Sequence, residues 1–227
     1  MKKIVVLSGA GISAESGIKT FRDADGLWNN YRIEEVASPV AWARNPQLVL
    51  DFYNIRRKQL YDVEPNAAHY ALAKLEKDFD VEIITQNVDD LHERAGSSKV
   101  LHLHGELKKV RSTVDPSLVH TLDGWELKIG DFCEKGSQLR PHIVWFGEEV
   151  NNIIIAGSIV RKADILVVIG TSLQVYPAAG LLHHAFRNIP KFLIDPNAEP
   201  DRSVQNLTVI REKATVGVPQ LVNQLRS

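Results

Sequence analysis

The feature of this sequence that most restricts its fold is the recurrence of short apolar runs rich in β-branched residues. Each run ends in a turn or loop signal, and helix-like segments separate most of the runs, which read KIVVLSG, VEIITQN, KVLHLHG, DILVVIG and KFLIDPN. Short apolar strands that alternate with helices are typical of a parallel sheet covered on both faces. The sequence therefore predicts an α/β fold with a doubly wound parallel sheet.

Ligands of such folds bind beyond the carboxyl ends of the strands. The polar loops that follow the apolar runs should form this edge: Gly9–Ser13, Gln86–Asp90, His104–Gly105, Gly170–Ser172 and Asp195–Glu199.

Two segments interrupt the alternation of strands and helices. Residues 22–61 combine a polar loop with helical patterning, whereas residues 106–140 are polar, rich in turns and without a clear period. We expect both to form a smaller inserted lobe within one domain that spans residues 1–227. The Rossmann-like core would then comprise residues 1–21, 62–105 and 141–227.

Composition narrows the class of protein. Hydrophobic residues make up 44% of the 227 residues and charged residues 24%, with a net charge of -1, which is ordinary for a soluble globular protein and argues against a nucleic-acid partner. The single cysteine, Cys133, cannot form an intrachain disulfide. The N-terminal apolar run is too short for a signal peptide, and no run is long enough to span a membrane. We expect a cytoplasmic protein, for which nothing demands more than a monomer.

The segment GAGISAESG follows the first apolar run. Gly9, Gly11 and Ala14 match the G-x-G-x-x-G/A pattern of dinucleotide-binding turns, in a strand–turn–helix context. Such glycines let the backbone approach a pyrophosphate, and a following helix N-terminus attracts the negative charge. The alternative is a tight turn that needs glycine only for steric reasons. The acidic residue that usually ends the second strand is missing, so a plain dehydrogenase fits poorly.

Two further loops carry groups able to bind or activate a ligand. Gln86, Asn87 and Asp89 could hydrogen-bond an amide and a ribose hydroxyl, although Asn87 and Asp89 could instead cap a helix near Leu91. His104 ends the run LHLHGE, where an imidazole with a pKa near neutrality suits a general base. The alternative is a structural histidine held by hydrogen bonds, and His102 raises the same question.

Two later segments complete this edge. Residues 140–148, RPHIVWFGE, could form an exposed strand that pairs with an extended peptide, or an ordinary edge strand. In GTSLQVYP, Gly170, Thr171 and Ser172 could cradle a ribose or a phosphate, and Val175 could face the same cleft.

The segment DFYNIRRKQL places Tyr53 and Arg56 three residues apart, on one face if the segment is helical. An amphipathic helix with a solvated arginine would explain the pattern. The alternative is a clamp for a small carboxylate, because arginine offers a fork of donors that matches this shape.

Taken in order, GAGISAESGIKTFR, TQNVDDLHERAG, HGE, PHIVWFGE and GTSLQVYPA resemble the motifs of the sirtuins, the NAD-dependent protein-lysine deacylases. The resemblance covers nearly the whole chain. It implies that NAD binds between a Rossmann-like domain and a small lobe, and that the acyl group of a protein lysine passes to ADP-ribose. The products would be nicotinamide, free lysine and 2′-O-acyl-ADP-ribose.

The resemblance also implies roles for individual residues. His104 would be the general base, Asn87 and Asp89 would hold the ribose and the nicotinamide amide, and Phe21 and Arg22 would shield and order the site. The residues expected to contact NAD are Gly9, Ala10, Gly11, Ser13, Ala14, Phe21, Arg22, Trp28, Gln86, Asn87, Val88, Asp89, Gly170, Thr171, Ser172, Asn197, Ala198, Glu199 and Ala214. Those expected to flank the substrate are Tyr53, Arg56, Val144, Trp145, Phe146, Gly147, Glu148, Val175 and Tyr176.

In the sirtuin branch that prefers acidic acyl groups, a Tyr-x-x-Arg pair lines the acyl-lysine pocket. YNIR matches this pair, so the resemblance favours the clamp, with succinyl or malonyl groups as substrates and acetyl groups also removed. The alternatives are a deacetylase without acidic preference, a protein mono-ADP-ribosyltransferase, and an NAD-binding module without catalysis.

Most sirtuins hold a structural zinc with two pairs of cysteines, and here the sequence departs from the family. The matching region contains only Cys133, with Val110, Arg111, Ser112 and Thr113 where the first pair is expected. The spacing of Asp115, His120 and Glu134 matches no zinc pattern, so we expect no zinc. We expect apolar contacts to hold this region instead, from Leu118, Leu122, Trp125 and Phe132. The segment LIDPNAEP also departs from the simpler family pattern around Asn197.

Overall fold

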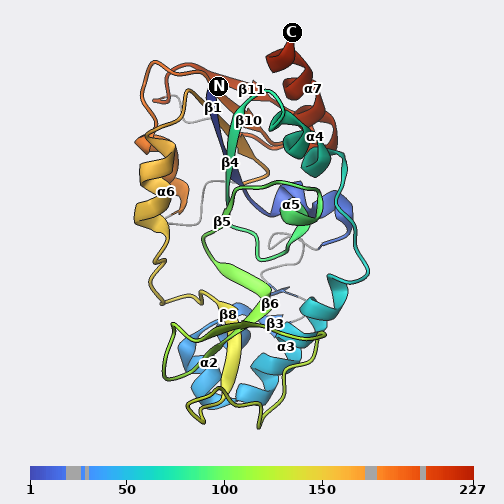
Figure 1. Ribbon diagram of the computed structural model, residues 1–227, viewed down its shortest axis with the longest axis vertical. Helices are drawn as coiled ribbons and strands as arrows, with labels where there is room; N and C mark the ends of the chain where they lie inside the picture. Colours follow the sequence, from blue (N-terminus) through green and yellow to red (C-terminus); the bar gives the residue numbers. More distant parts are fainter. Residues whose placement is uncertain (19–26, 29–30, 172–177, 200–202) are drawn as a thin grey trace.

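The computed structural model describes residues 1–18, 27–28, 31–171, 178–199 and 203–227, with the backbone alone at residues 27–28 and 178. Its main sheet is parallel throughout and occupies the upper half of Figure 1. Within the described residues the strand order is β11-β10-β9-β1-β4-β5. The strands are β1 (Lys3–Ser8), β4 (Asp80–Thr85), β5 (Val100–His102), β9 (Ile165–Ile169), β10 (Lys191–Ile194) and β11 (Leu207–Ile210).

Alternating side chains of the buried strands face two separate cores. Ile4 and Val6 of β1 pack in the core beneath α4 (Ala67–Leu75) and α7 (Ala214–Arg226). Val5 and Leu7 pack in the core beneath α6 (Ile153–Val160) and the 3₁₀ helix η3 (Ala178–His184). Figure 1 shows α6 on one side of the sheet and α4 and α7 on the other. A run apolar at every position is what a strand buried on both faces requires, so the predicted doubly wound fold is confirmed.

The order of the strands also locates the ligand edge. Along the chain, β4 and β5 are added on one side of β1, whereas β9, β10 and β11 are added on the other. The direction of winding therefore reverses between β1 and β9. Such a switch point is where α/β sheets bind ligands. The GAG loop follows β1 and Gly170 follows β9, so both lie at this point.

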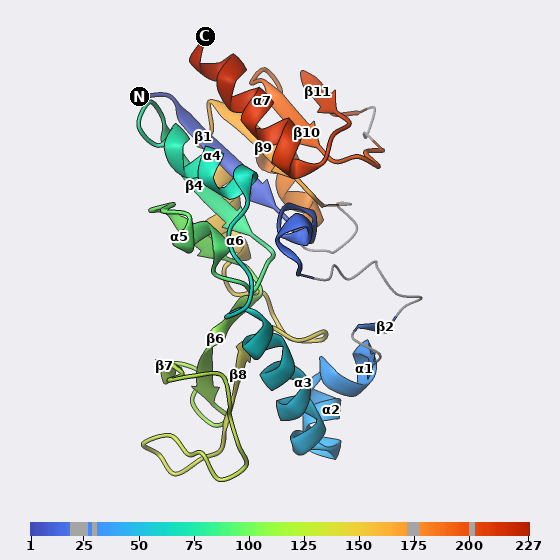
Figure 2. The same cartoon turned by 90° about the vertical axis from the view of Figure 1, so that its right-hand side faces the viewer.

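A second group of elements occupies the lower half of the molecule (Figures 1 and 2). The helices α2 and α3 each begin with an N-cap residue followed by proline, a strong sequence signal for a helix start. An antiparallel sheet of order β7-β6-β8 packs beside them. The elements are β2 (Leu27–Trp28), β3 (Tyr31–Arg32), α1 (Ile33–Val36), α2 (Pro39–Arg44), α3 (Pro46–Gln59), β6 (Gly105–Ser112), β7 (Val119–Thr121) and β8 (Leu139–Ile143).

The polar segment 106–140 is attached to α3 by buried side chains that bind its backbone. The Asn54 amide donates to the carbonyl oxygen of Leu127 (2.9 Å) and accepts from the Leu127 N–H (2.9 Å). The Arg57 guanidinium donates to the carbonyl oxygens of Leu107 and, at 2.7 Å, Trp125. Because α3 satisfies these backbone groups, a segment with few apolar residues can fold against it.

The apolar contacts expected for this segment are only partly present. Leu122 packs against a small core of Leu50, Val110 and Leu127. The prediction for Phe132 and Trp125 is wrong, because their side chains are 61% and 36% exposed. Among the described residues, no group of three or more histidine, cysteine or acidic side chains is placed to hold a metal ion. None of the described helices is long and apolar enough to cross a bilayer.

Two local predictions differ from the structure. The turn after β1 leads into two single 3₁₀ turns, Ala10–Ile12 and Ala14–Ser16, and not into a regular helix, because Gly17 takes a left-handed conformation and ends the second turn. The strand expected over residues 140–148 ends at Ile143. It ends there because the Trp145 N–H donates to the Glu148 carboxylate (2.8 Å), which closes a turn.

Candidate functional site

The loops after β1 and β9 interlock at the switch point. The Gly9 N–H donates to the Ile169 carbonyl oxygen (2.9 Å), and the Gly11 N–H donates to that of Gly170 (2.8 Å). A methyl group on Gly11 would lie 2.6 Å from Gly170 Cα, and one on Gly170 would lie 2.5 Å from the Ile12 nitrogen. Gly170 also has a φ of 58°, which favours glycine. The steric reason for these glycines is therefore present, and the same bare backbone leaves room for a ligand to approach.

Ser13 and Asn87 join the loops after β1 and β4. Both are buried, and the Asn87 amide nitrogen donates to the Ser13 hydroxyl (3.1 Å). The loop after β4 also contacts the loop after β9, since the Gln86 amide donates to the Thr171 hydroxyl (3.1 Å). The structure thus brings together polar side chains from three loops that are distant in sequence.

Asp89 adds a buried carboxylate to this cluster. Its Oδ1 accepts from the N–H of Leu91 (3.2 Å), the first residue of α5 (Leu91–Arg94), so the helix-capping interpretation holds for Asp89. It does not hold for Asn87, whose side chain bonds to Ser13. Burial raises the pKa of Asp89, although hydrogen bonds from Leu91 and Ser13 oppose the shift.

The two histidines of LHLHGE have different surroundings. His102 is bonded through both nitrogens, to the Asn87 carbonyl oxygen (2.9 Å) and to Glu93 (2.8 Å), and it holds the loop in place. Burial opposes protonation of His102, but Glu93 raises its pKa above the ordinary value. His104 lies beyond the end of β5, and among the described residues its ring has one hydrogen-bond partner, the Gln86 carbonyl oxygen at 3.1 Å from Nδ1.

This contact assigns the proton of His104. A carbonyl oxygen only accepts, so Nδ1 carries the hydrogen and Nε2 is left as the basic nitrogen. Burial lowers the pKa of His104 below its ordinary value, which keeps the ring neutral at neutral pH. A neutral, half-buried imidazole at the ligand edge has the properties of a general base.

The residues predicted to contact the adenosine half of the dinucleotide differ in their burial. Ala198 and Ala214 have buried side chains that belong to the two cores of the sheet. Asn197 is exposed, and its N–H donates to the Asp195 carboxylate (2.8 Å). Glu15, which the sequence analysis did not single out, binds the first turn of α7 by accepting from the Thr215 N–H (3.2 Å) and hydroxyl (2.7 Å).

Tyr53 and Arg56 lie on α3 and are both buried, with 1% and 7% exposure, which excludes the solvated arginine of the amphipathic alternative. The Arg56 guanidinium carbon lies 5.7 Å from the centre of the Phe52 ring. Burial lowers the pKa of Arg56 to about 10, although Tyr53 and Asp89 act in the opposite direction. The Tyr53 hydroxyl accepts from the Trp145 indole N–H (3.0 Å).

The loop of residues 144–148 is fixed by a network that the sequence analysis missed. Glu148 accepts a bidentate pair from Arg140 (2.6 and 3.0 Å) and a longer contact from Arg111 (3.2 Å). The Glu148 carboxylate is therefore occupied within the loop. The neighbouring backbone is bonded as well, because the Val144 N–H donates to the His104 carbonyl oxygen and the Phe146 N–H to that of Ala37. The available signal was one arginine and one glutamate on either side of the aromatic pair in LRPHIVWFGE.

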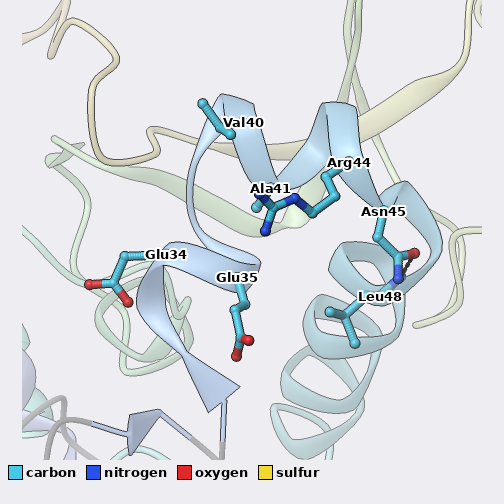
Figure 3. A pocket seen from close by; sticks show the side chains of 7 residues that line it. All are labelled: Glu34, Glu35, Val40, Ala41, Arg44, Asn45 and Leu48. Carbon is cyan, nitrogen blue, oxygen red and sulfur yellow. Dashed lines mark hydrogen bonds between the residues drawn. The ribbon is translucent and has the colours of Figure 1, made fainter.

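Several predicted residues lie outside the part of the chain that the structure describes: Phe21, Arg22, Ser172, Val175 and Tyr176, with the side chain of Trp28. A shallow pocket of about 210 Å³ lies between α1, α2 and α3 (Figure 3). It contains none of the predicted site residues. Its lining is Glu34, Glu35, Val40, Ala41, Arg44, Asn45 and Leu48.

The described residues fit a dinucleotide. Bare glycine backbone lies at the switch point of the sheet, amide, hydroxyl and carboxylate groups follow β1 and β4, and His104 follows β5 at the same edge. Hydroxyl and amide groups of a ribose and a nicotinamide need such donors and acceptors.

Comparisons with known proteins agree with this geometry. Residues 9–177 match the Sir2 family model. An NAD-dependent protein deacylase of Helicobacter pylori is 59% identical over 99% of this chain and 98% of its own length. One of Bacteroides thetaiotaomicron is 55% identical over 97% of each chain.

Solved structures give the same answer. A Sir2 homologue in complex with NAD has a TM-score of 0.88 at 43% identity, covering 99% of this chain and 90% of its own. A Sir2 protein bound to an acetylated peptide has a TM-score of 0.80 at 26% identity, over 98% and 93%. The chain therefore belongs to the Sir2 family, the family of NAD-dependent protein deacylases that its motifs resemble.

Proposed function

We propose that this chain removes acidic acyl groups, succinyl or malonyl, from protein lysines and also removes acetyl groups. As a member of the Sir2 family it is an NAD-dependent protein deacylase with NAD as co-substrate. The proposed products are nicotinamide, 2′-O-acyl-ADP-ribose and free lysine. The observation that supports the acidic preference is the buried pair of Tyr53 and Arg56 on α3.

The electrostatics of Arg56 favour an anionic ligand. A guanidinium removed from water is costly unless negative charge compensates for it. Burial lowers the pKa of Arg56, whereas Tyr53 and Asp89 act in the opposite direction. A carboxylate in hydrogen-bond range would add a charge-assisted contact and raise this pKa again. An uncharged acetyl group offers no such gain.

The residues at the sheet edge supply binding and proton transfer. When bound, NAD supplies an activated ribose carbon that accepts the acyl oxygen as nicotinamide leaves. Asn87, Asp89 and Ser13 would hold the polar groups of the ribose and the amide. His104 Nε2 would take the proton of a ribose hydroxyl, with Nδ1 held on the Gln86 carbonyl oxygen. The substrates would be acylated lysines of cytoplasmic proteins.

A peptide assay tests the proposal. Acetyl-lysine and succinyl-lysine peptides of one sequence are compared at equal concentration with NAD, and free lysine peptide and acyl-ADP-ribose are measured by mass spectrometry. We expect the wild type to prefer the succinyl peptide. Arg56→Met should lower succinyl kcat/KM by roughly 10- to 100-fold, the value of a hydrogen bond to a charged group, and leave acetyl activity largely intact.

Lys58→Met is the matched control, because Lys58 is an exposed cation two residues further along the same helix. Preference for the acetyl peptide, with little effect of Arg56→Met, would refute the acidic preference. Release of nicotinamide with ADP-ribose appearing on protein, and without acyl-ADP-ribose, would instead support an ADP-ribosyltransferase.

A further inference from the structure

One hydrogen bond links the loop of residues 144–148 to the proposed acyl pocket. The indole N–H of Trp145 donates to the phenolic oxygen of Tyr53 across 3.0 Å, and both side chains are buried. The two residues lie 92 positions apart in sequence. The ring centres are 6.5 Å apart with planes inclined by 32°, so the contact depends on the N–H and not on stacking alone.

Trp145 is itself held on several sides. The Arg140 guanidinium carbon lies 3.3 Å from the centre of its indole ring, and Trp42 lies 5.8 Å away on another side. Its backbone N–H donates to Glu148 (2.8 Å), and Arg140 binds the same carboxylate. Because these contacts hold the indole, the Trp145 N–H has one orientation. The hydrogen bond then fixes the orientation of its acceptor, the Tyr53 hydroxyl.

The direction of this hydrogen bond determines what the Tyr53 hydroxyl can offer. Its oxygen already accepts from Trp145, so its own hydrogen points elsewhere. Among the described residues, no acceptor forms a hydrogen bond with that hydrogen. Burial raises the pKa of Tyr53 well above its ordinary value, so the hydroxyl remains a donor. A hydroxyl that accepts one hydrogen bond donates the next one more strongly.

We propose that Trp145 is a positioning residue for acyl selectivity, which aims the Tyr53 hydroxyl at the carboxylate that Arg56 binds. This inference rests on the proposed function, since it requires an acidic acyl group between Tyr53 and Arg56. Trp145 does not touch the substrate carboxylate in this proposal. Trp145 orients one of the two donors, the Tyr53 hydroxyl. The helix α3 positions the other donor, Arg56.

A purely structural role for Trp145 predicts a different result. If the indole only filled space in the core, its removal would weaken the enzyme toward both acyl groups alike. If it orients Tyr53, removal of the N–H alone should lower activity toward the succinyl substrate more than activity toward the acetyl substrate. The ratio of the two kcat/KM values therefore separates the interpretations.

The experiment measures kcat and KM for succinyl and acetyl peptides with the wild type, Tyr53→Phe, Trp145→Phe and the double variant. We expect each single variant to lower the succinyl-to-acetyl ratio by roughly fivefold, the net value of one hydrogen bond, mainly through succinyl KM. The double variant should lower it no further than Tyr53→Phe, because both act through one hydroxyl. Trp42→Phe is the matched control, an indole in contact with Trp145 that makes no hydrogen bond to Tyr53.

The outcomes distinguish this inference from the proposed function. If the wild type shows no preference for succinyl, the proposed function fails and the inference with it. If the preference exists and Tyr53→Phe lowers it, but Trp145→Phe leaves it unchanged or adds fully to Tyr53→Phe, the inference alone is wrong. Should Trp145→Phe fail to fold, benzothienylalanine at position 145 keeps the shape of the indole and replaces the N–H by sulfur. A ratio unchanged by that analogue would also refute the inference.

Discussion

The six-stranded and the three-stranded sheet of this protein are held together by different kinds of interaction. At the switch point of the six-stranded sheet, the loops after β1 and β9 meet backbone to backbone, with glycine where they touch. In the three-stranded sheet, buried side chains of α3 bind the backbone of residues 107–127. The first arrangement tolerates no added side chain, whereas the second depends on two side chains. An added methyl group should therefore destabilise the first region, and a removed side chain should destabilise the second.

The largest expected effect is that of a methyl group at the switch point. Gly170→Ala combines a left-handed φ with a contact of 2.5 Å to the backbone of Ile12, and we expect a loss of about 3 to 4 kcal/mol in the free energy of unfolding. Gly124→Ala in the second region also has a positive φ but nothing within 4 Å, so it should cost about 1 kcal/mol. Urea denaturation measures both. An equal loss of unfolding free energy in the two variants would show that the loops after β1 and β9 do not pack tightly.

Acid should weaken the region of the six-stranded sheet through its buried histidines. Burial lowers the pKa of His69 from 6.5 to about 4, and that of His92, whose ring lies 5.0 Å away, is also lowered. The unfolded chain then binds more protons than the folded chain between these pH values, so stability falls as pH decreases from 6.5 to 4. The loss from His69 is on the order of 3 kcal/mol.

The variant His69→Gln should flatten this dependence, because glutamine keeps an acceptor for the Asn66 N–H and cannot be protonated. His183→Gln, at an exposed histidine, is the control. Unfolding free energies at several pH values test the idea. An unchanged slope in His69→Gln would contradict it.

In the second region, removal of one side chain should loosen a whole segment. Arg57→Met leaves the carbonyl oxygens of Leu107 and Trp125 without this donor, and we expect a cost of about 2 to 3 kcal/mol. Hydrogen exchange should quicken across residues 106–140 and stay slow in β1, β4 and β9. Arg44→Met, at an exposed arginine of α2, should change neither. Uniformly faster exchange would mean that the two regions are not independent.

The smallest expected effect concerns activity. Burial lowers the pKa of His104 below 6.5, so this proposed base stays neutral over most of the physiological range and becomes protonated only in acid. The kcat/KM profile should have an acid limb below pH 6.5, with about a tenfold loss per further pH unit. A midpoint above 6.5 would show that another group limits the reaction, or that His104 has a different environment.

The sequence predicted the first region far better than the second. Strands buried on both faces are apolar at every position, and glycine marks the close contact between their loops, so local pattern was enough. In residues 106–140 the strands are polar, and their partners are single side chains of a distant helix. Arg56 and Arg57 are neighbours of one type, and periodicity alone cannot say which belongs to the proposed acyl pocket and which binds the Trp125 carbonyl oxygen. The contact from Trp145 to Tyr53 joins residues too far apart for spacing to indicate it.

The arrangement of α3 has a consequence for how enzymes of this kind can diverge. Tyr53 and Arg56 lie one helical turn apart and serve the proposed substrate, while Asn54 and Arg57 lie one turn apart and attach the second sheet. The two pairs alternate along the helix. A lineage could therefore exchange one pair and acquire a new acyl preference without first losing its fold, so that selection on substrate range and selection on foldability act on separate positions of a single helix.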